Sequence, residues 1–275
     1  MIKIITDSTI YVKKAEVQEL EIRIVPVTYT VNGYPYCESY ADNNGNFKEF
    51  FKYNRKLTTS GPNPSAFLSA FEEELALGNE VLCMTISSRL SGTYSAAYMA
   101  AKQTESKDVF VVDSHLTAGG LYLLVCEAKK CIDQGETMAE IIQKLLKIRD
   151  KITVAFSVDD MTPLRNSGRI GFVRMSVGTF LNIKPILLCK DGAVVSESSA
   201  HGNNGIVKKL VEKIPSYVSE LTVNYIANNR LACHIYTAIR EKYPDIKMRM
   251  SQMGPVLAVH LGLDVVGISF LDEKI

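Results

Sequence analysis

The sequence predicts an α/β protein of two domains. In the first half, short apolar strands alternate with helical segments, which is the pattern of a mainly parallel sheet. The second half contains the hairpin signal Lys190-Asp191-Gly192, which is typical of a mixed or antiparallel sheet. We place the boundary near Asp150, with domains over 1–150 and 151–275. No Gly/Ser-rich linker marks this boundary, so we expect the domains to be in close contact.

In the first half, hydrophobic periodicity and turn residues predict the strands and helices. Strands are expected at 2–5, 22–31, 81–86 and 108–114, and helices at 12–20, 46–54, 65–77, 94–101, 118–134 and 137–148. Asn32-Gly33 predicts a hairpin turn after the second strand. The Ser/Pro-rich segment 58–65 is expected to be a loop, and Thr137 with Glu140 forms a capping box at the last helix.

The second half has a different order of predicted strands and helices. Strands are expected at 153–158, 185–188, 193–196, 221–227, 246–250 and 264–270, and helices at 159–166, 173–181, 206–218 and 230–242. Gly168 closes the first of these helices. No internal repeat and no low-complexity segment appears.

Composition limits the function classes. The 275 residues are 47% hydrophobic and 22% charged, with a net charge of +1. This near-neutral balance does not favour nucleic acid or an anionic membrane surface as a partner. The first residues become polar too soon for a signal peptide, and no apolar run approaches the ~20 residues of a membrane span. We therefore expect a soluble, cytoplasmic protein. The six cysteines form no CxxC pair, so we interpret them as reduced core residues rather than zinc ligands or disulfides.

The most informative stretch runs from 81 to 101. An apolar strand is followed by a hydroxyl-rich turn and an alanine-rich helix, and the turn contains Ser87, Ser88, Ser91 and Thr93, with Gly92 among them. The free N–H groups of a helix start can bind an anion, and glycine lets a ligand approach the backbone. One hydroxyl would suffice for a simple cap. Four of them in seven residues favour an anion site.

Two other strands end in polar residues, at Asp7 and at Asp113. The carboxyl ends of parallel strands meet at one edge of a sheet, where ligands bind. Asp is also a preferred helix cap, and for each of these two residues alone capping is the better interpretation.

Catalytic motifs are scarce. The sequence has no phosphate-binding glycine loop, no G-x-S-x-G elbow and no H-E-x-x-H, and we expect no metal and no cofactor. The four histidines are His115, His201, His234 and His260. A Ser–His pair assembled by the fold remains an alternative, because such pairs are not set by sequence spacing.

The motifs of this sequence resemble those of the bacterial DegV family, and the similarity spans nearly the whole chain. The matching blocks are Thr6-Asp7-Ser8-Thr9, Thr59-Ser60, Ser87 through Tyr94, Val112-Asp113-Ser114, Ser167 through Ile170, Leu181 through Leu187, Asp191-Gly192, Gly254-Pro255, His260 and Gly262. Each motif is weak alone, but their order and spacing together are specific.

The resemblance implies two α/β domains with a long-chain fatty acid buried between them. It implies a carrier, not an enzyme, that presents the carboxylate to a separate ATP-dependent fatty acid kinase, and the acyl phosphate then feeds phospholipid synthesis. The family's carboxylate-binding positions match Thr59, Ser91 and His260, with Ser60 and Gly92 beside them. Arg169 matches an arginine at the head-group rim, and we assign it, with Arg174, to kinase docking. The apolar residues Phe172, Met175, Phe180 and Met253 could line the tail pocket, although ordinary core packing fits each of them.

The sequence departs from the family pattern beside this site. His260 is followed by Leu261-Gly262-Leu263-Asp264 where the family usually has Thr-Gly-Pro-Gly, and Gly61-Pro62-Asn63-Pro64 replaces the usual Gln-Pro-Ser. These changes bear on the carboxylate contacts and on the preferred acyl chain, not on the fold. Two alternatives stay open: a hydrolase or acyltransferase that uses Ser91 and His260, and a ligand-sensing regulator.

Overall fold

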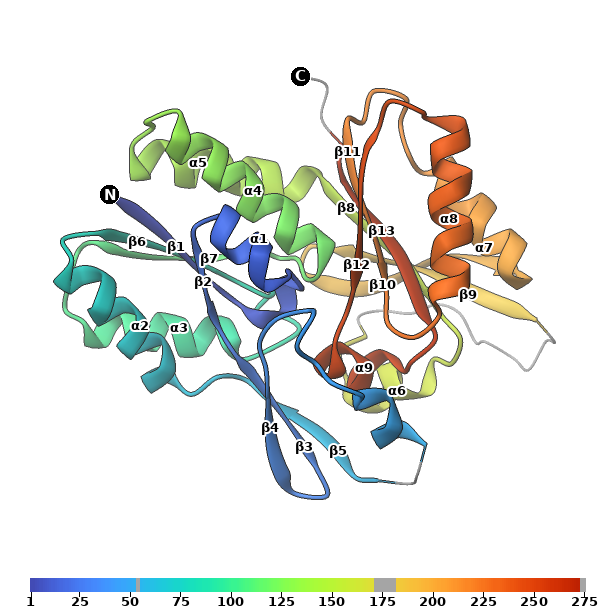
Figure 1. Ribbon diagram of the computed structural model, residues 1–275, viewed down its shortest axis with the longest axis horizontal. Helices are drawn as coiled ribbons and strands as arrows, with labels where there is room; N and C mark the ends of the chain where they lie inside the picture. Colours follow the sequence, from blue (N-terminus) through green and yellow to red (C-terminus); the bar gives the residue numbers. More distant parts are fainter. Residues whose placement is uncertain (53–54, 171–181, 273–275) are drawn as a thin grey trace.

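The computed structural model describes residues 1–52, 55–170 and 182–272. It confirms the predicted α/β class, with a parallel sheet and a mixed sheet, and adds a small third sheet (Figure 1). The predicted helix at 173–181 lies outside the described residues. All strands of the parallel sheet precede Ser114, and all strands of the mixed sheet follow Lys151. This distribution supports the boundary near Asp150, which stays a prediction.

The parallel sheet has the strand order β2-β1-β6-β7. Its strands are β1 (Ile2–Asp7), β2 (Ile22–Val25), β6 (Glu80–Thr85) and β7 (Val109–Asp113). One face packs against α2 (Pro64–Ala76) and α3 (Thr93–Gln103), and the other packs against α4 (Gly119–Asp133) and α5 (Met138–Ile148). The short helices η1 (Ser8–Ile10) and α1 (Lys14–Glu19) follow β1. The strand ends that precede Ser8, Ile86 and Ser114 therefore share one edge, as predicted.

The mixed sheet has the order β10-β9-β8-β13-β11-β12, in which only β11 and β12 run parallel. Its strands are β8 (Ile152–Val158), β9 (Ile183–Lys190), β10 (Ala193–His201), β11 (Glu220–Tyr225), β12 (Lys247–Gln252) and β13 (Val265–Leu271). Helices α7 (Gly202–Glu212) and α8 (Asn229–Lys242) cover one face. Helix α4 contacts the opposite side at β8 and β13 and also reaches β1 and β6, so it packs against both large sheets.

The small sheet was not predicted as such. The expected strand at 22–31 is broken by Pro26, which has no N–H to donate to a ladder. Its first part is β2, and its second part, β3 (Val27–Val31), pairs with β4 (Tyr34–Glu38) and β5 (Leu57–Ser60) and projects from the body (Figure 1). Asn32 and Gly33 both have positive φ, which confirms the predicted hairpin turn.

Two local predictions were wrong in detail, and one helix was not predicted. The segment predicted as a loop at 58–65 contains β5, and the helix expected at 46–54 is the short 3₁₀ helix η2 (Phe47–Phe51). Helix α9 (Pro255–Leu261) was not predicted at all. The other short elements are η3 (Arg149–Lys151) and α6 (Thr162–Ser167).

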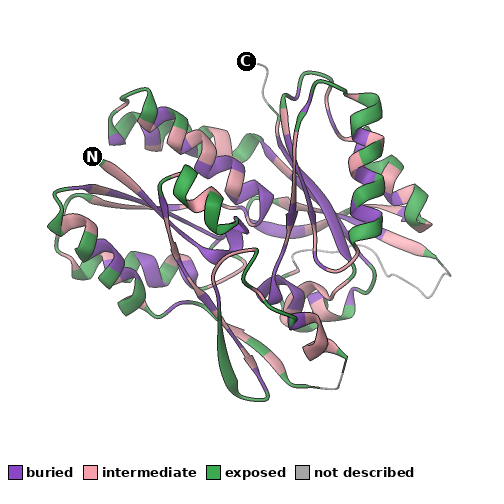
Figure 2. Cartoon of the chain, viewed as in Figure 1, coloured by how far each residue is buried: buried purple, intermediate pink, exposed green. Residues whose placement is uncertain are grey.

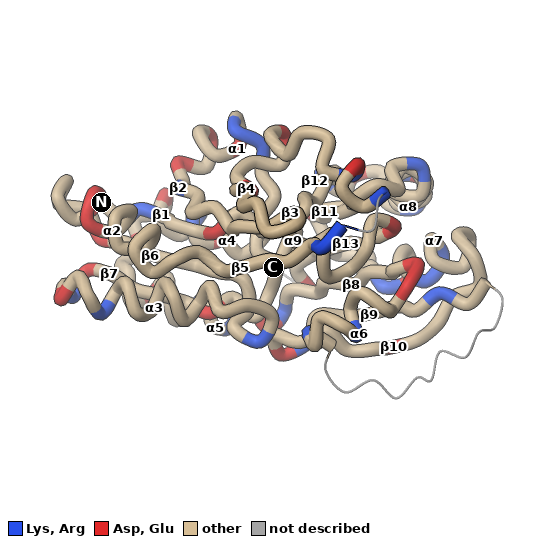
Figure 3. The backbone as a smooth tube through the Cα atoms, turned by 90° about the horizontal axis from the view of Figure 1, so that it is seen from below, with Lys and Arg blue, Asp and Glu red and all other residues tan. Residues whose placement is uncertain are grey.

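Burial follows the strands and the inner faces of the helices (Figure 2). All six cysteines are free thiols, but Cys37 and Cys233 are exposed, so the interpretation of the set as core residues was wrong for these two. Lys and Arg are interspersed with Asp and Glu along the surface elements (Figure 3). No helix in the described part of the chain has the length and apolar character needed to cross a bilayer.

Candidate functional site

A cavity of about 130 Å³ lies where the parallel, mixed and small sheets meet. Most of its wall is apolar. The apolar lining residues include Val27, Ile86, Leu90, Ala118, Val154, Phe156, Leu164, Val194, Met253, Val256, Leu257, Leu261 and Val265. The same cavity is lined by Thr59, Ser60, Ser91, Gly92, Arg169 and His260. The structure thus brings together, around one space, five residues expected at the carboxylate and one expected at the rim.

Thr59 and His260 form the closest polar pair of this site. Strand β5 alternates, so that Thr58 is exposed while Thr59 is half-buried. The Oγ1 atom of Thr59 lies 2.7 Å from Nε2 of His260, which is carried by α9. The tautomer of the imidazole decides which of the two donates. A ligand oxygen placed beside this pair would find a hydroxyl and a ring nitrogen that are already aligned.

Burial holds His260 in its neutral form. Removal from water and, secondarily, the positive charge of Arg169 lower the pKa of His260 to about 4. Near neutral pH the ring therefore offers a hydrogen bond without a charge. Arg169 itself is exposed, and its Nε donates to the carbonyl of Leu90 at 3.3 Å, so the cation stands at the rim next to the Ser91 turn.

The Ser91 turn supplies a further hydroxyl to the cavity wall. Ser91 Oγ lies 2.9 Å from Thr93 Oγ1, and Gly92 precedes the first residue of α3. A Cβ added to Gly61 would lie 3.4 Å from Thr93 Oγ1, so the segment after β5 passes close to this helix start. The turn therefore lies beside the segment that follows β5.

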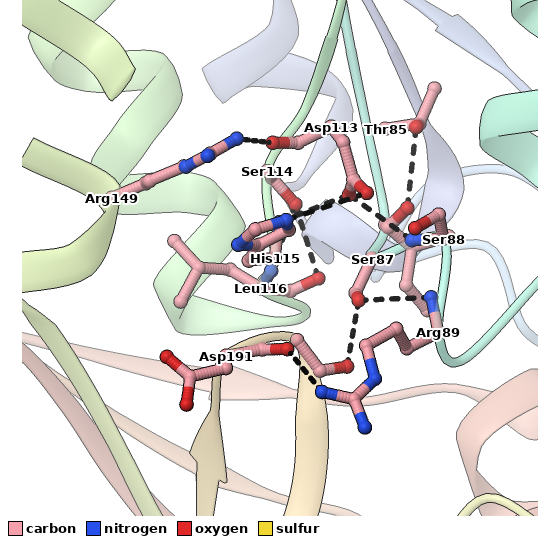
Figure 4. Close-up of polar contacts among 12 residues, drawn as sticks. Thr85, Ser87, Ser88, Arg89, Asp113, Ser114, His115, Leu116, Arg149 and Asp191 are labelled. Carbon is pink, nitrogen blue, oxygen red and sulfur yellow. Dashed lines mark hydrogen bonds and ion pairs between the residues drawn. The ribbon is translucent and has the colours of Figure 1, made fainter. Parts of the chain in front are cut away.

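Backbone contacts fix the turn in place (Figure 4). Ser87 Oγ donates to the carbonyl of Gly192 at 2.7 Å, and Arg89 Nη1 donates to the carbonyl of Asp191 at 2.9 Å. Asp113 Oδ1 accepts from the N–H groups of Ser88 and His115. The hairpin between β9 and β10 is thus tied to the strand ends of the parallel sheet.

Asp7 plays the capping role that the sequence favoured. It accepts from the N–H of Thr9 at 2.9 Å and from the N–H of Ile86 at 2.7 Å. Burial raises the pKa of this carboxyl. Asp7 therefore holds the strand that leads into the Ser87 turn.

The other residues singled out in the sequence lie in different places. Met253 is buried in a hydrophobic core cluster and also lines the cavity. Arg174, Phe172, Met175 and Phe180 lie outside the described residues. His115, His201 and His234 are not among the residues that line the cavity. Within the described residues, no cluster of His, Cys, Asp and Glu could hold a metal ion.

Sequence reasoning missed Glu38, which positions the helix that carries His260. Its side chain is buried at 1% exposure. Its Oε2 accepts from the N–H of Val256 at 2.9 Å and its Oε1 from Ser8 Oγ at 3.3 Å. A Cβ on Gly254 would lie 2.4 Å from the carboxylate. A lone Glu at the end of a strand carries no signal of such a role. The one available signal was Gly254, because a glycine before Pro255 is typical of a place where another group packs closely against the backbone.

Glu38 should make stability depend on pH. Burial raises its pKa from 4.5 to about 8. Between these values the folded protein retains a proton that the unfolded chain has released, so the free energy of unfolding falls as the pH rises through this window. Glu38→Gln keeps the shape without titrating. We expect the melting temperature of the wild type to fall, relative to that of Glu38→Gln, as the pH is raised from about 4.5 to about 8.

The measurement is thermal unfolding by circular dichroism over a pH series. The exposed Glu72→Gln serves as the control and should follow the wild type. If the melting temperatures of the wild type and of Glu38→Gln change with pH in parallel, the Glu38 carboxyl does not titrate in this window.

Comparison with known proteins identifies the family. The family model described as an uncharacterised protein of the DegV family matches residues 1–273. A DegV domain-containing protein of Halalkalibacterium halodurans is 32% identical, with 99% of each chain covered. A DegV lipid-binding protein of Thermotoga maritima has a similar structure, with a TM-score of 0.86, 26% identity and 98% of each chain covered. A fatty-acid-binding DegV family protein of Thermus thermophilus aligns with a TM-score of 0.85 and 26% identity over 98% of this chain and 99% of its own. This chain therefore belongs to the DegV family.

Proposed function

We propose that the protein binds a long-chain fatty acid in the cavity, with the carboxylate against Thr59, Ser91 and His260, and presents it to a separate ATP-dependent fatty acid kinase. The observation that carries the proposal is the asymmetry of the cavity, which is apolar over most of its wall but has hydroxyls, a neutral imidazole and an arginine at its rim. The lipid and fatty acid binding described for the Thermotoga and Thermus proteins supports it. The kinase and the use of the acyl phosphate in phospholipid synthesis rest on the family resemblance.

The free energies of burying the acyl chain and of forming the head-group hydrogen bonds show what each contributes to binding. Burying an acyl chain gains about 0.8 kcal/mol per CH₂, so sixteen carbons give a gross term on the order of 12 kcal/mol. A hydrogen bond to a charged group nets roughly 1.5–3 kcal/mol. The tail therefore sets the affinity, while Thr59, Ser91 and His260 set the register and orientation of the carboxylate.

The contacts favour this binding role over a hydrolase or acyltransferase. A nucleophilic serine needs a base within hydrogen-bond reach. Here the Nε2 of His260 is engaged by Thr59, and the Ser91 hydroxyl is engaged by Thr93. A reactive-serine probe that labels Ser91 would favour the hydrolase. A pull-down that recovers partners but no kinase would favour a ligand-sensing regulator.

The direct test is mass spectrometry of the lipid extracted from gently purified protein. We expect a long-chain fatty acid in a ratio near one per chain, because the buried tail makes release slow. A protein that emerges free of lipid and then fails to bind added fatty acids would contradict the proposal.

The head-group residues should matter more for presentation than for binding. Thr59→Val and Ser91→Ala each remove one hydroxyl, so we expect affinity for the acid to fall by about tenfold to a hundredfold. Kinase-coupled turnover should fall further, since the carboxylate is no longer oriented. Thr58→Val on the exposed side of the same strand and Ser95→Ala on the exposed side of α3 are the matched controls. An affinity that collapses by many orders of magnitude in a folded variant would contradict the dominance of the tail.

The protein alone should neither hydrolyse ATP nor activate a fatty acid. Phosphoryl transfer needs Mg²⁺ and positive charge arranged around a triphosphate, and the sequence has no glycine loop to hold one. ATP consumption with long-chain acids and Mg²⁺ is measured with and without a candidate kinase, and acyl phosphate formed by this chain alone would overturn the carrier. Arg169→Glu should lower the coupled rate by a larger factor than it lowers the affinity for the acid, because the proposed docking contact is lost in addition to the attraction for the carboxylate. Unchanged coupling would remove Arg169 from the docking surface, on which we also place Arg174.

A further inference from the structure

A second polar group lines the same cavity, on elements other than those that carry the head-group residues. It consists of Asn224 on β11, Ser269 on β13 and Thr117, which precedes α4. Asn224 is 4% exposed and Ser269 is 0% exposed. The surrounding wall is apolar, with Val154, Phe156 and Ile268 among its residues. Asn224, Ser269 and the hydroxyl oxygen of the half-buried Thr117 are therefore buried in the part of the cavity that a hydrocarbon chain would otherwise fill.

The hydrogen bonds of this group are incomplete. Ser269 Oγ donates to Asn224 Oδ1 at 3.4 Å. Among the described residues, neither Asn224 Nδ2 nor Thr117 Oγ1 has a hydrogen-bond partner, although both atoms are buried. Buried polar atoms are almost always paired, and leaving them unpaired costs free energy. If the Asn224 amide is turned over, its oxygen is left unpaired instead, so one polar atom still lacks a partner.

The backbone makes room for the group. A Cβ on Gly119, the first residue of α4, would lie 2.4 Å from Asn224 Oδ1 and 2.8 Å from Ser269 Oγ. Glycine at this position lets α4 start directly over the two polar side chains. Asn224 is also paired in register with Gly267 on β13, which lines the cavity. The polar group thus occupies space that small residues on both sides keep open.

A hydrocarbon tail leaves these atoms unpaired, whereas a hydroxyl group can both donate and accept. We propose that the cavity selects long-chain fatty acids that carry a hydroxyl group along the chain, held by Asn224 and Thr117. This inference rests on the proposed function and specifies its ligand class. The hydroxyl accepts from the amide N–H of Asn224 and shares a hydrogen bond with the Thr117 hydroxyl.

The test is competition binding on delipidated protein between octadecanoic acid and a series of octadecanoic acids with one hydroxyl at successive positions. Pairing the buried atoms should favour at least one member of the series by roughly tenfold over the unsubstituted acid. Thr117→Val and Asn224→Leu should each abolish that preference while the variants still bind the unsubstituted acid. Thr222→Val is the matched control, because the Thr222 hydroxyl is also buried and unpartnered among the described residues but does not line the cavity.

The outcomes separate this inference from the proposed function. If the unsubstituted acid binds and every hydroxylated acid binds more weakly, or if Thr117→Val and Asn224→Leu leave the ratio unchanged, the hydroxyl selection is wrong while the carrier stands. A crystal structure with the unsubstituted acid and an ordered water between Asn224 and Thr117 would also overturn it. Failure of all the acids to bind contradicts the carrier itself. Thr117→Val is isosteric, so the test does not depend on Asn224→Leu folding.

Discussion

The buried carboxyl of Glu38 is the contact on which the geometry of the site depends. It receives hydrogen bonds from the N–H of Val256, at the start of α9, and from Ser8, just after β1. Ser8 in turn accepts from the N–H of Val27, at the start of β3. One side chain therefore joins the parallel sheet, the small sheet and the helix that carries His260. Because burial keeps this carboxyl largely protonated near neutral pH, the junction holds little charge in a dry environment.

The fold could be predicted from the sequence wherever periodicity is strong. Apolar runs such as 81–86 and the capped helix that begins after Thr137 fall where expected, because local pattern and tertiary burial agree there. The small sheet could not be predicted, since Thr58-Thr59-Ser60 has the composition of a loop and becomes a strand only by pairing with β3. Helix α9 has seven residues and starts at Gly254-Pro255, so it offers too few turns for a period to appear.

The site was predicted through family resemblance rather than through spacing. Thr59 and His260 are 201 residues apart, and no local pattern predicts their contact at 2.7 Å. Only the hydroxyl-rich turn at Ser91 was predicted from physical reasoning without the resemblance, as a helix start suited to binding an anion. Asn224 and Glu38 gave no such signal. A polar residue in a strand looks the same in the sequence whether it faces water, a partner or a cavity, and only the packed structure distinguishes these cases.

The central place of β13 has a consequence for the order in which the protein matures. This strand, at Val265–Leu271, is the last described strand to leave the ribosome, yet it lies between β8 and β11. Until it inserts, the mixed sheet is split into two halves with unpaired edges, which are prone to pair with other chains. The walls around Val154 and Asn224 are contributed by those same halves. The mixed sheet, and with it this part of the cavity wall, is therefore complete only after β13 has been synthesised and has inserted between β8 and β11.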